Sequence, residues 1–393
     1  MEETLSRYSK RGVSASKTEV HDAIKNLDKG LYPNAFCKVI PDIVGNDPAY
    51  CNIMHADTAG TKTVLAYMFW RETGDASVWR NIVQDAIVMN IDDMACVGCV
   101  DNYVLSSTIG RNKSVIKAEV VKTLIEATDD FCKFLKSVGI NMYLAGGETA
   151  DVGDIVRTAD VGFTVFSRLK RENIIENKIS AGNVIVGLAS TGKATYEKFE
   201  NSGIGCNGLT SARHDVLDSF YAKMYPETFD PSVDKDVIFS GSKRLSDTFT
   251  INNQSARIGD WLLSPTRTFT PIIKKVIETV GAKNLAGIIH NTGGGQTKVI
   301  KFAENVRIIK NNLFAVPQLF QLIQHESKTP WYEMYKVFNM GHRLEFYCSE
   351  QVAEQIINIS KGFNVEAKII GCVEALENKT EVIVESEKGR FVY

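Results

Sequence analysis

Carboxylate residues beside glycine are the part of this sequence that could do chemistry. Asp57 lies in Ala-Asp-Thr-Ala-Gly-Thr-Lys, which follows a short predicted strand at residues 50–55. Gly60 would let the backbone approach a ligand closely, and Lys62 could reach a phosphate as a point charge. Glu148 follows a second predicted strand, in Ala-Gly-Gly-Glu-Thr-Ala. Both segments are candidates for a cation or phosphate site.

Three further acids, Asp85, Asp92 and Asp93, lie in a segment whose apolar residues recur at helical spacing over residues 78–94. Residues seven apart share a helix face, so Asp85 and Asp92 should point the same way. Mg²⁺ prefers oxygen ligands and shares them with nucleotide phosphates, so the acidic segments favour a magnesium–nucleotide site. Isolated acids are more often caps, turn residues or solvated surface residues, and that alternative stays open from pattern alone.

Small-residue segments in the C-terminal half could bind an anion. Thr292 and three glycines follow a predicted strand at residues 285–290, and consecutive glycines can expose several backbone N–H groups. Arg267, in Leu-Ser-Pro-Thr-Arg before a predicted helix, could bind a phosphate. The segment 333–341, Glu-Met-Tyr-Lys-Val-Phe-Asn-Met-Gly, precedes another strand. The alternatives are a plain turn, a helix cap with a surface arginine, and an edge loop.

Helices and strands are predicted along the whole chain, which indicates a mixed α+β or α/β fold of two domains. The polar segment 168–179 separates them, so we expect an N-terminal domain over residues 1–172 and a C-terminal domain over residues 173–393. The main predicted helices are 78–94, 115–136, 270–280 and 352–359, and the main predicted strands are 50–55, 142–144, 161–167, 183–189, 285–290, 343–348 and 367–373.

Charge and composition restrict the class of protein. Lys and Arg number 45 and Asp and Glu number 47, so the net charge of −2 argues against a dedicated nucleic-acid binder. We find no signal peptide and no apolar run long enough to span a bilayer, and therefore expect a cytoplasmic protein with reduced thiols and no membrane partner. Cys96 and Cys99 could bind zinc, but one such pair without a nearby histidine favours buried thiols.

The order and spacing of these segments resemble the aminoimidazole ribonucleotide synthetase family, also called the phosphoribosylformylglycinamidine cyclo-ligases, over nearly the whole chain. Six motifs in order are a specific signal, although one alone would be weak. They match at Asp57–Lys62 (D-G-V-G-T-K), Asp85 with Asp92-Asp93 (Asp, then Asn-Asp), Gly146–Ala150 (G-G-E-T-A), Leu262–Arg267 (L-L-x-P-T-R), His290–Gly295 (H-x-T-G-G-G) and Glu333–Gly341 (E-M-Y-x-x-F-N-x-G).

The resemblance implies two domains, with the N-terminal sheets paired in a homodimer and the active site in a cleft near that interface. It implies ATP and Mg²⁺ as cofactors and a small nucleotide as substrate. In that reaction ATP phosphorylates the formyl oxygen of formylglycinamidine ribonucleotide, and the amidine nitrogen then closes the imidazole ring. Such chemistry needs positioning and charge neutralisation more than a protein nucleophile.

The resemblance also implies roles for single residues. Asp57, Asp93 and Glu148 would hold Mg-ATP, and Lys62 would neutralise phosphate charge; these four would be the catalytic residues. Asp92 stands where the family has Asn. The nucleotide would also contact Gly60, Thr61, Asp85, Asp92, Gly146, Gly147 and Thr149, and the substrate would contact Thr292, Gly293, Gly294, Gly295, Arg267, Asn339 and Asn207.

Three departures from the family pattern leave alternatives open. The family's glycine-rich stretch before the first strand is replaced by residues 33–41, which contain no glycine. After an insertion at 193–204, the family's histidine position falls on Gly205, and His214 is either a substitute or a helical surface residue. Arg343 replaces a family glycine and either fills a pocket or adds a phosphate contact. A non-catalytic or differently specific nucleotide-binding relative is therefore the alternative function.

Overall fold

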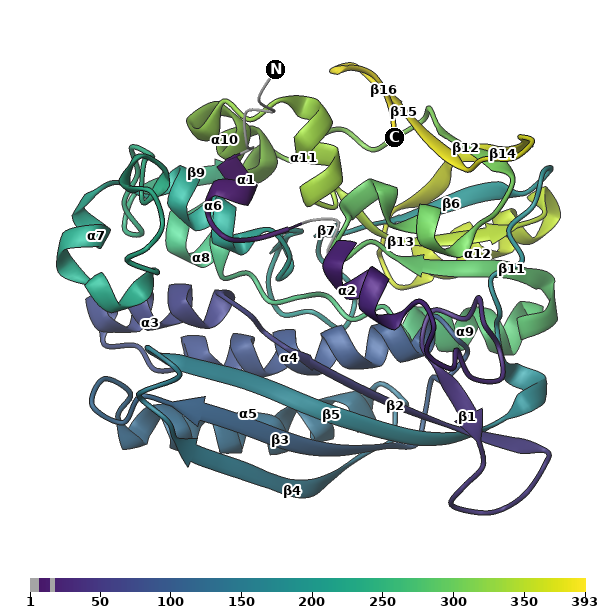
Figure 1. Ribbon diagram of the computed structural model, residues 1–393, viewed down its shortest axis with the longest axis horizontal. Helices are drawn as coiled ribbons and strands as arrows, with labels where there is room; N and C mark the ends of the chain where they lie inside the picture. Colours follow the sequence, from purple (N-terminus) through teal and green to yellow (C-terminus); the bar gives the residue numbers. More distant parts are fainter. Residues whose placement is uncertain (1–6, 15–17) are drawn as a thin grey trace.

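The computed structural model describes residues 7–14 and 18–393, which form two large β-sheets with helices between and around them (Figure 1). The five-stranded sheet has the order β1-β2-β5-β3-β4, and the seven-stranded sheet has the order β11-β13-β6-β14-β12-β15-β16. The predicted mixed α/β architecture is therefore confirmed. Among the described helices, none is long and apolar enough to cross a membrane.

The N-terminal half supplies the five-stranded sheet and, between residues 62 and 137, the long helices that cover one of its faces (Figure 1). In this sheet β3 and β4 run parallel, and the other neighbours run antiparallel. The strands are β1 (Val39–Pro41), β2 (Tyr50–Thr58), β3 (Tyr103–Arg111), β4 (Met142–Asp151) and β5 (Ala159–Lys170), and the helices are α1 (Arg7–Lys10), α2 (Thr18–Ile24), α3 (Lys62–Thr73), α4 (Val78–Ala95) and α5 (Ala118–Ser137).

The C-terminal half supplies the seven-stranded sheet and two short ribbons, β7–β8 and β9–β10. The strands are β6 (Val184–Ala189), β7 (Thr191–Gly192), β8 (Asn201–Ser202), β9 (Thr248–Ile251), β10 (Gln254–Arg257), β11 (Leu285–His290), β12 (Val306–Lys310), β13 (His342–Cys348), β14 (Ala367–Ala375), β15 (Glu381–Ser386) and β16 (Gly389–Val392). The helices are α6 (Leu209–Val216), α7 (Phe220–Met224), α8 (Ile258–Leu262), α9 (Thr270–Val280), α10 (Gln318–Ser327), α11 (Trp331–Val337) and α12 (Glu350–Gly362).

Several element boundaries differ by a few residues from the sequence prediction, and two of the differences have a clear cause. Helix α5 begins at Ala118, because the preceding residues form a turn in which the N–H groups of Val115 and Ile116 donate to the carbonyl of Asn112. Strand β4 continues to Asp151, so the Gly-Gly-Glu-Thr segment lies within a strand. Gly146 adopts a φ of 102°, and the β3–β4 register shifts there, so the glycines allow an irregular strand instead of ending it.

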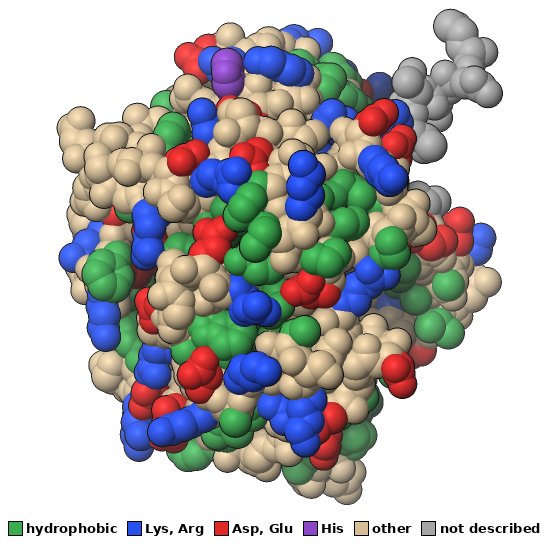
Figure 2. Space-filling view, turned by 90° about the vertical axis from the view of Figure 1, so that its left-hand side faces the viewer, with side chains coloured by type: hydrophobic (Ala, Val, Ile, Leu, Met, Phe, Trp, Pro, Cys, Tyr) green, Lys and Arg blue, Asp and Glu red, His purple; other side chains and the backbone are tan. Residues whose placement is uncertain are grey.

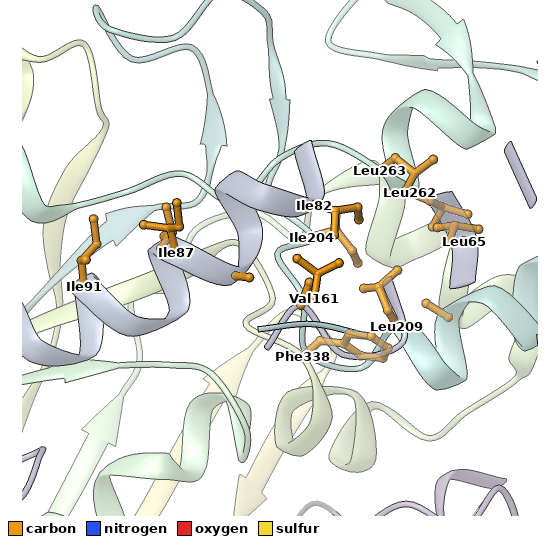
Figure 3. Packing of buried hydrophobic residues seen from close by; sticks show 14 of the residues in the cluster. Leu65, Ile82, Ile87, Ile91, Val161, Ile204, Leu209, Leu262, Leu263 and Phe338 are labelled. Carbon is orange, nitrogen blue, oxygen red and sulfur yellow. The ribbon is translucent and has the colours of Figure 1, made fainter. Parts of the chain in front are cut away.

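Helix α4 is the central element, because it is buried against the five-stranded sheet on one side and the C-terminal half on the other (Figure 1). A helix that is apolar on all sides is typical of such an interior position. Figure 3 shows Ile82, Ile87 and Ile91 of α4 among apolar side chains from both halves of the chain. The face in Figure 2 carries interspersed basic and acidic side chains, as the balanced composition leads us to expect.

Polar contacts fasten α4 to the segment that leads into α9. Asp92 accepts hydrogen bonds from the N–H groups of Phe269 (2.8 Å) and Thr270 (3.2 Å) and from the hydroxyls of Thr268 (2.7 Å) and Thr270 (2.8 Å). Because Asp92 is fully buried, it satisfies N–H groups at the start of α9 that no helical carbonyl can reach.

Asp85 makes the second such junction. Its Oδ1 accepts from Lys62 Nζ (2.9 Å) and from the N–H and hydroxyl of Thr266 (2.7 and 2.6 Å). Lys62 Nζ also donates to the carbonyl of Ser264 (2.6 Å). Since neither Asp85 nor Lys62 is exposed, this ion pair is an internal contact between α3, α4 and the 264–266 segment.

Replacing Asp92 with Ala would leave several buried donors without an acceptor, so we expect the free energy of unfolding to fall by on the order of 3 kcal/mol. The measurement is the urea midpoint at unchanged m-value. Asp130→Ala is the matched control, because Asp130 lies on the exposed face of α5 and pairs with Arg80 at the surface; its midpoint should stay near that of the wild type. An unchanged midpoint for Asp92→Ala would contradict the junction.

Candidate active site

Two of the predicted acids, Asp57 at the end of β2 and Asp93 in the last turn of α4, affect each other's ionisation. Burial and the nearby charge of Asp93 raise the pKa of Asp57 above its ordinary value. Burial also opposes ionisation of Asp93, but Lys298 and the hydrogen-bonded His290 outweigh it and lower the pKa of Asp93. The site therefore holds one readily ionised carboxylate and a second whose ionisation costs free energy until a cation is nearby.

Two histidines flank Asp93. His290 Nδ1, at the end of β11, lies 2.6 Å from Asp93 Oδ1, and His55 Nε2, on β2, lies 3.7 Å from Asp93 Oδ2. His55 Nδ1 in turn lies 3.0 Å from the side-chain oxygen of Asn90. The sequence analysis did not single out His55, although it lies two residues before Asp57 on one strand and so shares its face.

Lys298 is a second residue that the motifs did not reveal. Its Nζ donates to the hydroxyl of Thr292, and its charge acts on both Asp57 and Asp93. Nζ also lies 4.6 Å from the ring centre of Phe36, a favourable cation–π distance. The glycine-free 33–41 segment therefore lies against this site through an aromatic ring.

Asp57 and Asp93 are the groups that could hold Mg²⁺. Across residues 7–14 and 18–393, no cluster of three or more His, Cys, Asp or Glu is arranged to bind a metal ion. Mg²⁺ at nucleotide sites needs only one or two carboxylates, because water and phosphate oxygens supply its other ligands. The unneutralised Asp57–Asp93 pair fits that chemistry. Cys96 and Cys99 are buried free thiols, as predicted.

The glycine loop after β11 approaches the acids through Lys298. Gly294 and Gly295 have φ values of 98° and 49°. A Cβ at Gly295 would lie 2.6 Å from the carbonyl oxygens of Tyr335 and Phe338, so only glycine fits there. Gly293 is exposed, and the nearest atom to a Cβ built there is Nδ2 of Asn207, at 3.8 Å. The predicted substrate residues Thr292, Gly293, Gly294, Gly295 and Asn207 thus lie together.

A pocket of about 470 Å³ with both basic and acidic lining residues lies beside Gly60 and Thr61. Arg11 and Arg213 line it; Arg11 pairs with Asp215 at 2.6 Å. Arg213 is buried, its Nε has no hydrogen-bond partner among the described residues, and burial and the nearby Arg11 lower its pKa to about 9. A buried guanidinium beside a glycine turn suits an anionic ligand.

Five predicted ligand residues are instead held inside the protein: Lys62, Asp85, Asp92, Arg267 and Asn339. Arg267 binds the carboxylate of Glu197 (2.6 Å) and the carbonyls of Ala189, Thr191 and Gly192. Asn339 donates to the carbonyl of Gly203 (2.8 Å) and accepts from the hydroxyl of Ser190 (3.0 Å). In the structure these polar groups bind other parts of the chain, and their roles as ligand contacts stay predictions.

Glu148 does not join the other acids within one chain. It is exposed on β4 with Gly146, Gly147 and Thr149. Glu148 pairs with Thr108, Thr108 with Gly162, and Gly162 with Thr58, so three strand spacings separate it from β2. At about 4.8 Å per spacing, a single chain keeps Glu148 well away from Asp57.

His214 does not supply a base. It is buried, its Nδ1 accepts from the N–H of Phe239 (3.2 Å), and burial with two nearby arginines places its pKa far below the ordinary value. The alternative of a surface histidine is therefore also wrong. The 193–204 insertion contributes Glu197 to the Arg267 contact and contains β8.

The chain matches known proteins over nearly its whole length. Residues 39–169 match the family model described as AIR synthase related protein, N-terminal domain. The phosphoribosylformylglycinamidine cyclo-ligase of Methanococcus maripaludis (strain C7) is 30% identical over 96% of this chain and 93% of its own length. The protein of the same name from Staphylococcus carnosus is 30% identical over 83% of this chain and 81% of its own length.

Three solved structures share the fold at 12–13% identity. A HypE–HypF complex gives a TM-score of 0.55 with 96% of this chain and 99% of that chain covered, and AaThiL bound to AMPPCP and TMP gives 0.54 with 96% of both covered. T. maritima PurL bound to FGAR gives 0.52 over 88% of this chain, which spans less than half (45%) of the PurL chain. With motifs, fold and full-length similarity in agreement, this chain belongs to the phosphoribosylformylglycinamidine cyclo-ligase family.

Proposed function

We propose that the protein catalyses ATP-dependent ring closure of formylglycinamidine ribonucleotide to aminoimidazole ribonucleotide in purine biosynthesis, with release of ADP and phosphate. The observation that carries the proposal is the Asp57–Asp93 pair linked through Lys298 to the glycine loop. It lies in a chain that matches cyclo-ligases from end to end. Acids for a cation and a loop for a substrate phosphate are what this reaction needs.

The reaction proceeds in two steps. The formyl oxygen attacks the γ-phosphorus of ATP, and ADP leaves. The amidine nitrogen then bonds to the activated formyl carbon, and the phosphorylated oxygen departs as phosphate with loss of a proton from nitrogen. Bound Mg²⁺ supplies charge neutralisation for the phosphates, and Asp57 and Asp93 hold it. Glycine-loop N–H groups orient the substrate.

Lys298 takes the phosphate-neutralising role that the motif match assigned to Lys62. Lys62 Nζ is buried against Asp85, whereas Lys298 lies between Thr292 and the two acids. ATP phosphates would then lie between the acids and Arg213, in the pocket beside Gly60 and Thr61. T. maritima PurL, which has been solved with ATP, and AaThiL, solved with AMPPCP, share this fold.

The open face of the N-terminal sheet supports a homodimer. Cross-strand pairs align Met54, Phe166, Val104 and Tyr143 in one row, and Met54 and Tyr143 are 64% and 60% exposed. A contiguous apolar row on a sheet face favours burial against another surface, and a second copy offers the same row under two-fold symmetry. Glu148, on the adjoining edge strand, would then approach the partner.

The proposed domain division follows the break between β5, which ends at Lys170, and β6, which begins at Val184. It assigns residues 1–172 to nucleotide binding and dimerisation and residues 173–393 to substrate binding. The eight free cysteines fit a reducing, cytoplasmic location. The alternative is a nucleotide-binding relative without this turnover.

The first experiment incubates the purified protein with Mg-ATP and formylglycinamidine ribonucleotide and follows ADP and aminoimidazole ribonucleotide together. We expect equal amounts of both. Asp93→Asn should lower kcat/KM by on the order of 100-fold or more, because it removes charge that holds the cation, and the surface variant Asp130→Asn should not. ATP binding without turnover would favour the alternative, and absence of ATP binding would overturn the acidic site.

Asp57→Asn should raise the melting temperature of the ligand-free protein at pH 7 by roughly 1–3 °C. A carboxyl whose pKa is raised by folding destabilises the folded state above both pKa values, and the penalty vanishes below the unfolded value of about 4. The gain should therefore shrink as the pH falls towards 4.

The matched control is Asp154→Asn, at an exposed position, whose melting temperature should follow the wild type at each pH. Mg-ADP should stabilise the wild type more than Asp57→Asn. An Asp57→Asn protein that melts at or below the wild-type temperature at pH 7 would contradict a strained carboxylate pair.

A further inference from the structure

Arg343 is a buried cation next to the proposed site. It lies on β13 with 3% of its surface exposed. Its Nε lies 3.1 Å from His290 Nε2, and its Nη2 donates to the carbonyl of Arg267 at 2.6 Å. Among the described residues no carboxylate lies within ion-pair distance of it, so hydrogen bonds hold the guanidinium. The sequence left two roles open for Arg343, filling a pocket or contacting a phosphate. The structure favours the first, because Arg343 fills an internal space.

The contact with His290 determines which histidine nitrogen carries the proton. A guanidinium nitrogen donates and cannot accept, so Nε2 of His290 must be the unprotonated acceptor. The proton is then on Nδ1, which donates to Asp93 Oδ1 at 2.6 Å. With the opposite tautomer, Nε2–H would face Arg343 Nε–H, and Nδ1 would face a carboxylate without a proton between them.

The chain Arg343–His290–Asp93 therefore has one consistent direction of donation. It leaves Asp93 Oδ2, the oxygen nearer His55, free to bind a cation together with Asp57. Groups that hydrogen-bond the partner of a metal ligand commonly determine its orientation and affinity for the ion.

Gly205 provides the space that Arg343 occupies. A Cβ at Gly205 would lie 2.6 Å from Nη1 of Arg343. Gly205 has a φ of 68°, so a side chain there would also be strained. The guanidinium carbon lies 5.7 Å from the ring centre of Phe269, so neighbours on several sides hold it against His290. A side chain at position 205 would therefore displace the end of the Arg343 side chain from its place against His290.

We propose that Arg343 is a positioning residue for the nucleotide-bound cation: it keeps the His290 proton on Nδ1, so that His290 orients Asp93, and Gly205 is the space that makes this possible. The inference deepens the proposed function and rests on it for the reaction. The tautomer and the geometry of Asp93 do not depend on which substrate is bound.

The direct test is the nitrogen spectrum of His290 in protein labelled with ¹⁵N-histidine. The chain has six histidines, and the signal lost in His290→Gln identifies the right one. We expect the Nδ1–H tautomer in the wild type and its loss in Arg343→Met, which keeps most of the side-chain volume without a donor. Persistence of the Nδ1–H tautomer in a folded Arg343→Met protein would overturn the proposal, whatever the activity.

The second test measures binding of Mn²⁺, as a probe for Mg²⁺, in the presence of ADP by electron paramagnetic resonance. Arg343→Met should weaken binding by up to about 10-fold, because losing a direct partner of a metal ligand costs about 10- to 100-fold and Arg343 acts only through His290. Arg343→Lys, which retains a donor, should recover part of it. Arg307→Met is the control, because Arg307 lies on β12, outside the site, and pairs with Glu381 on β15. Equal weakening in Arg343→Lys and Arg343→Met would overturn the hydrogen-bond argument.

Gly205→Ala tests the same contact without touching the arginine. We expect it to weaken Mn²⁺ binding in the wild type and to have little further effect in the Arg343→Met background, since contacting residues give non-additive effects. Strictly additive effects would overturn the link between the two positions. If Mn²⁺ binding and the tautomer respond as expected but aminoimidazole ribonucleotide is not formed, the proposed function fails while the positioning role stands.

Discussion

Burial of the carboxylates on α4 is the constraint on which the rest of the structure depends. A helix between two layers must carry mostly apolar side chains, and each ionised group on it needs a partner, because an unpaired buried charge costs several kcal/mol or more. Asp85 and Asp92 find partners in Lys62 and in the 266–270 segment. These contacts fix how the C-terminal half lies on the N-terminal half, and therefore which groups face Asp93.

The surroundings of Asp93 differ from those of Asp85 and Asp92 on the same helix. His290 and His55 contact Asp93, and the charge of Lys298 acts on it, from three separate elements. Burial and the charge of Asp93 raise the pKa of Asp57. Other parts of the chain bind the acids that join its halves, whereas the carboxyl of Asp57 ionises at a cost in free energy. Such a local electrostatic cost is typical of sites that bind a cation or phosphate.

The sequence allowed the fold class, helix α4 and the Asp57–Asp93 pair to be predicted, because apolar periodicity and ordered motifs are local signals. The sequence could not show which side chains pair with one another across different elements. Lys62 and Arg267 look like phosphate ligands in a motif, but Asp85 and Glu197, which neutralise them, lie on other elements. The same limit hid Lys298, which lies in a 3₁₀ helix (Gly295–Phe302) that places its Nζ over the ring of Phe36. At Glu148 a local signal was itself misleading. The neighbouring Gly146 and Gly147 suggested a turn, but they lie within strand β4.

The departures from the family pattern become consistent once they are seen as neighbours in space. The guanidinium of Arg343 occupies the space beside Gly205, so two departures far apart in sequence meet in one packing contact. A buried arginine without a carboxylate partner is costly, and hydrogen bonds to His290 and to the carbonyl of Arg267 offset that cost. Because one of those bonds ends on a group bound to Asp93, the packing change acts directly on the electrostatics of the cleft.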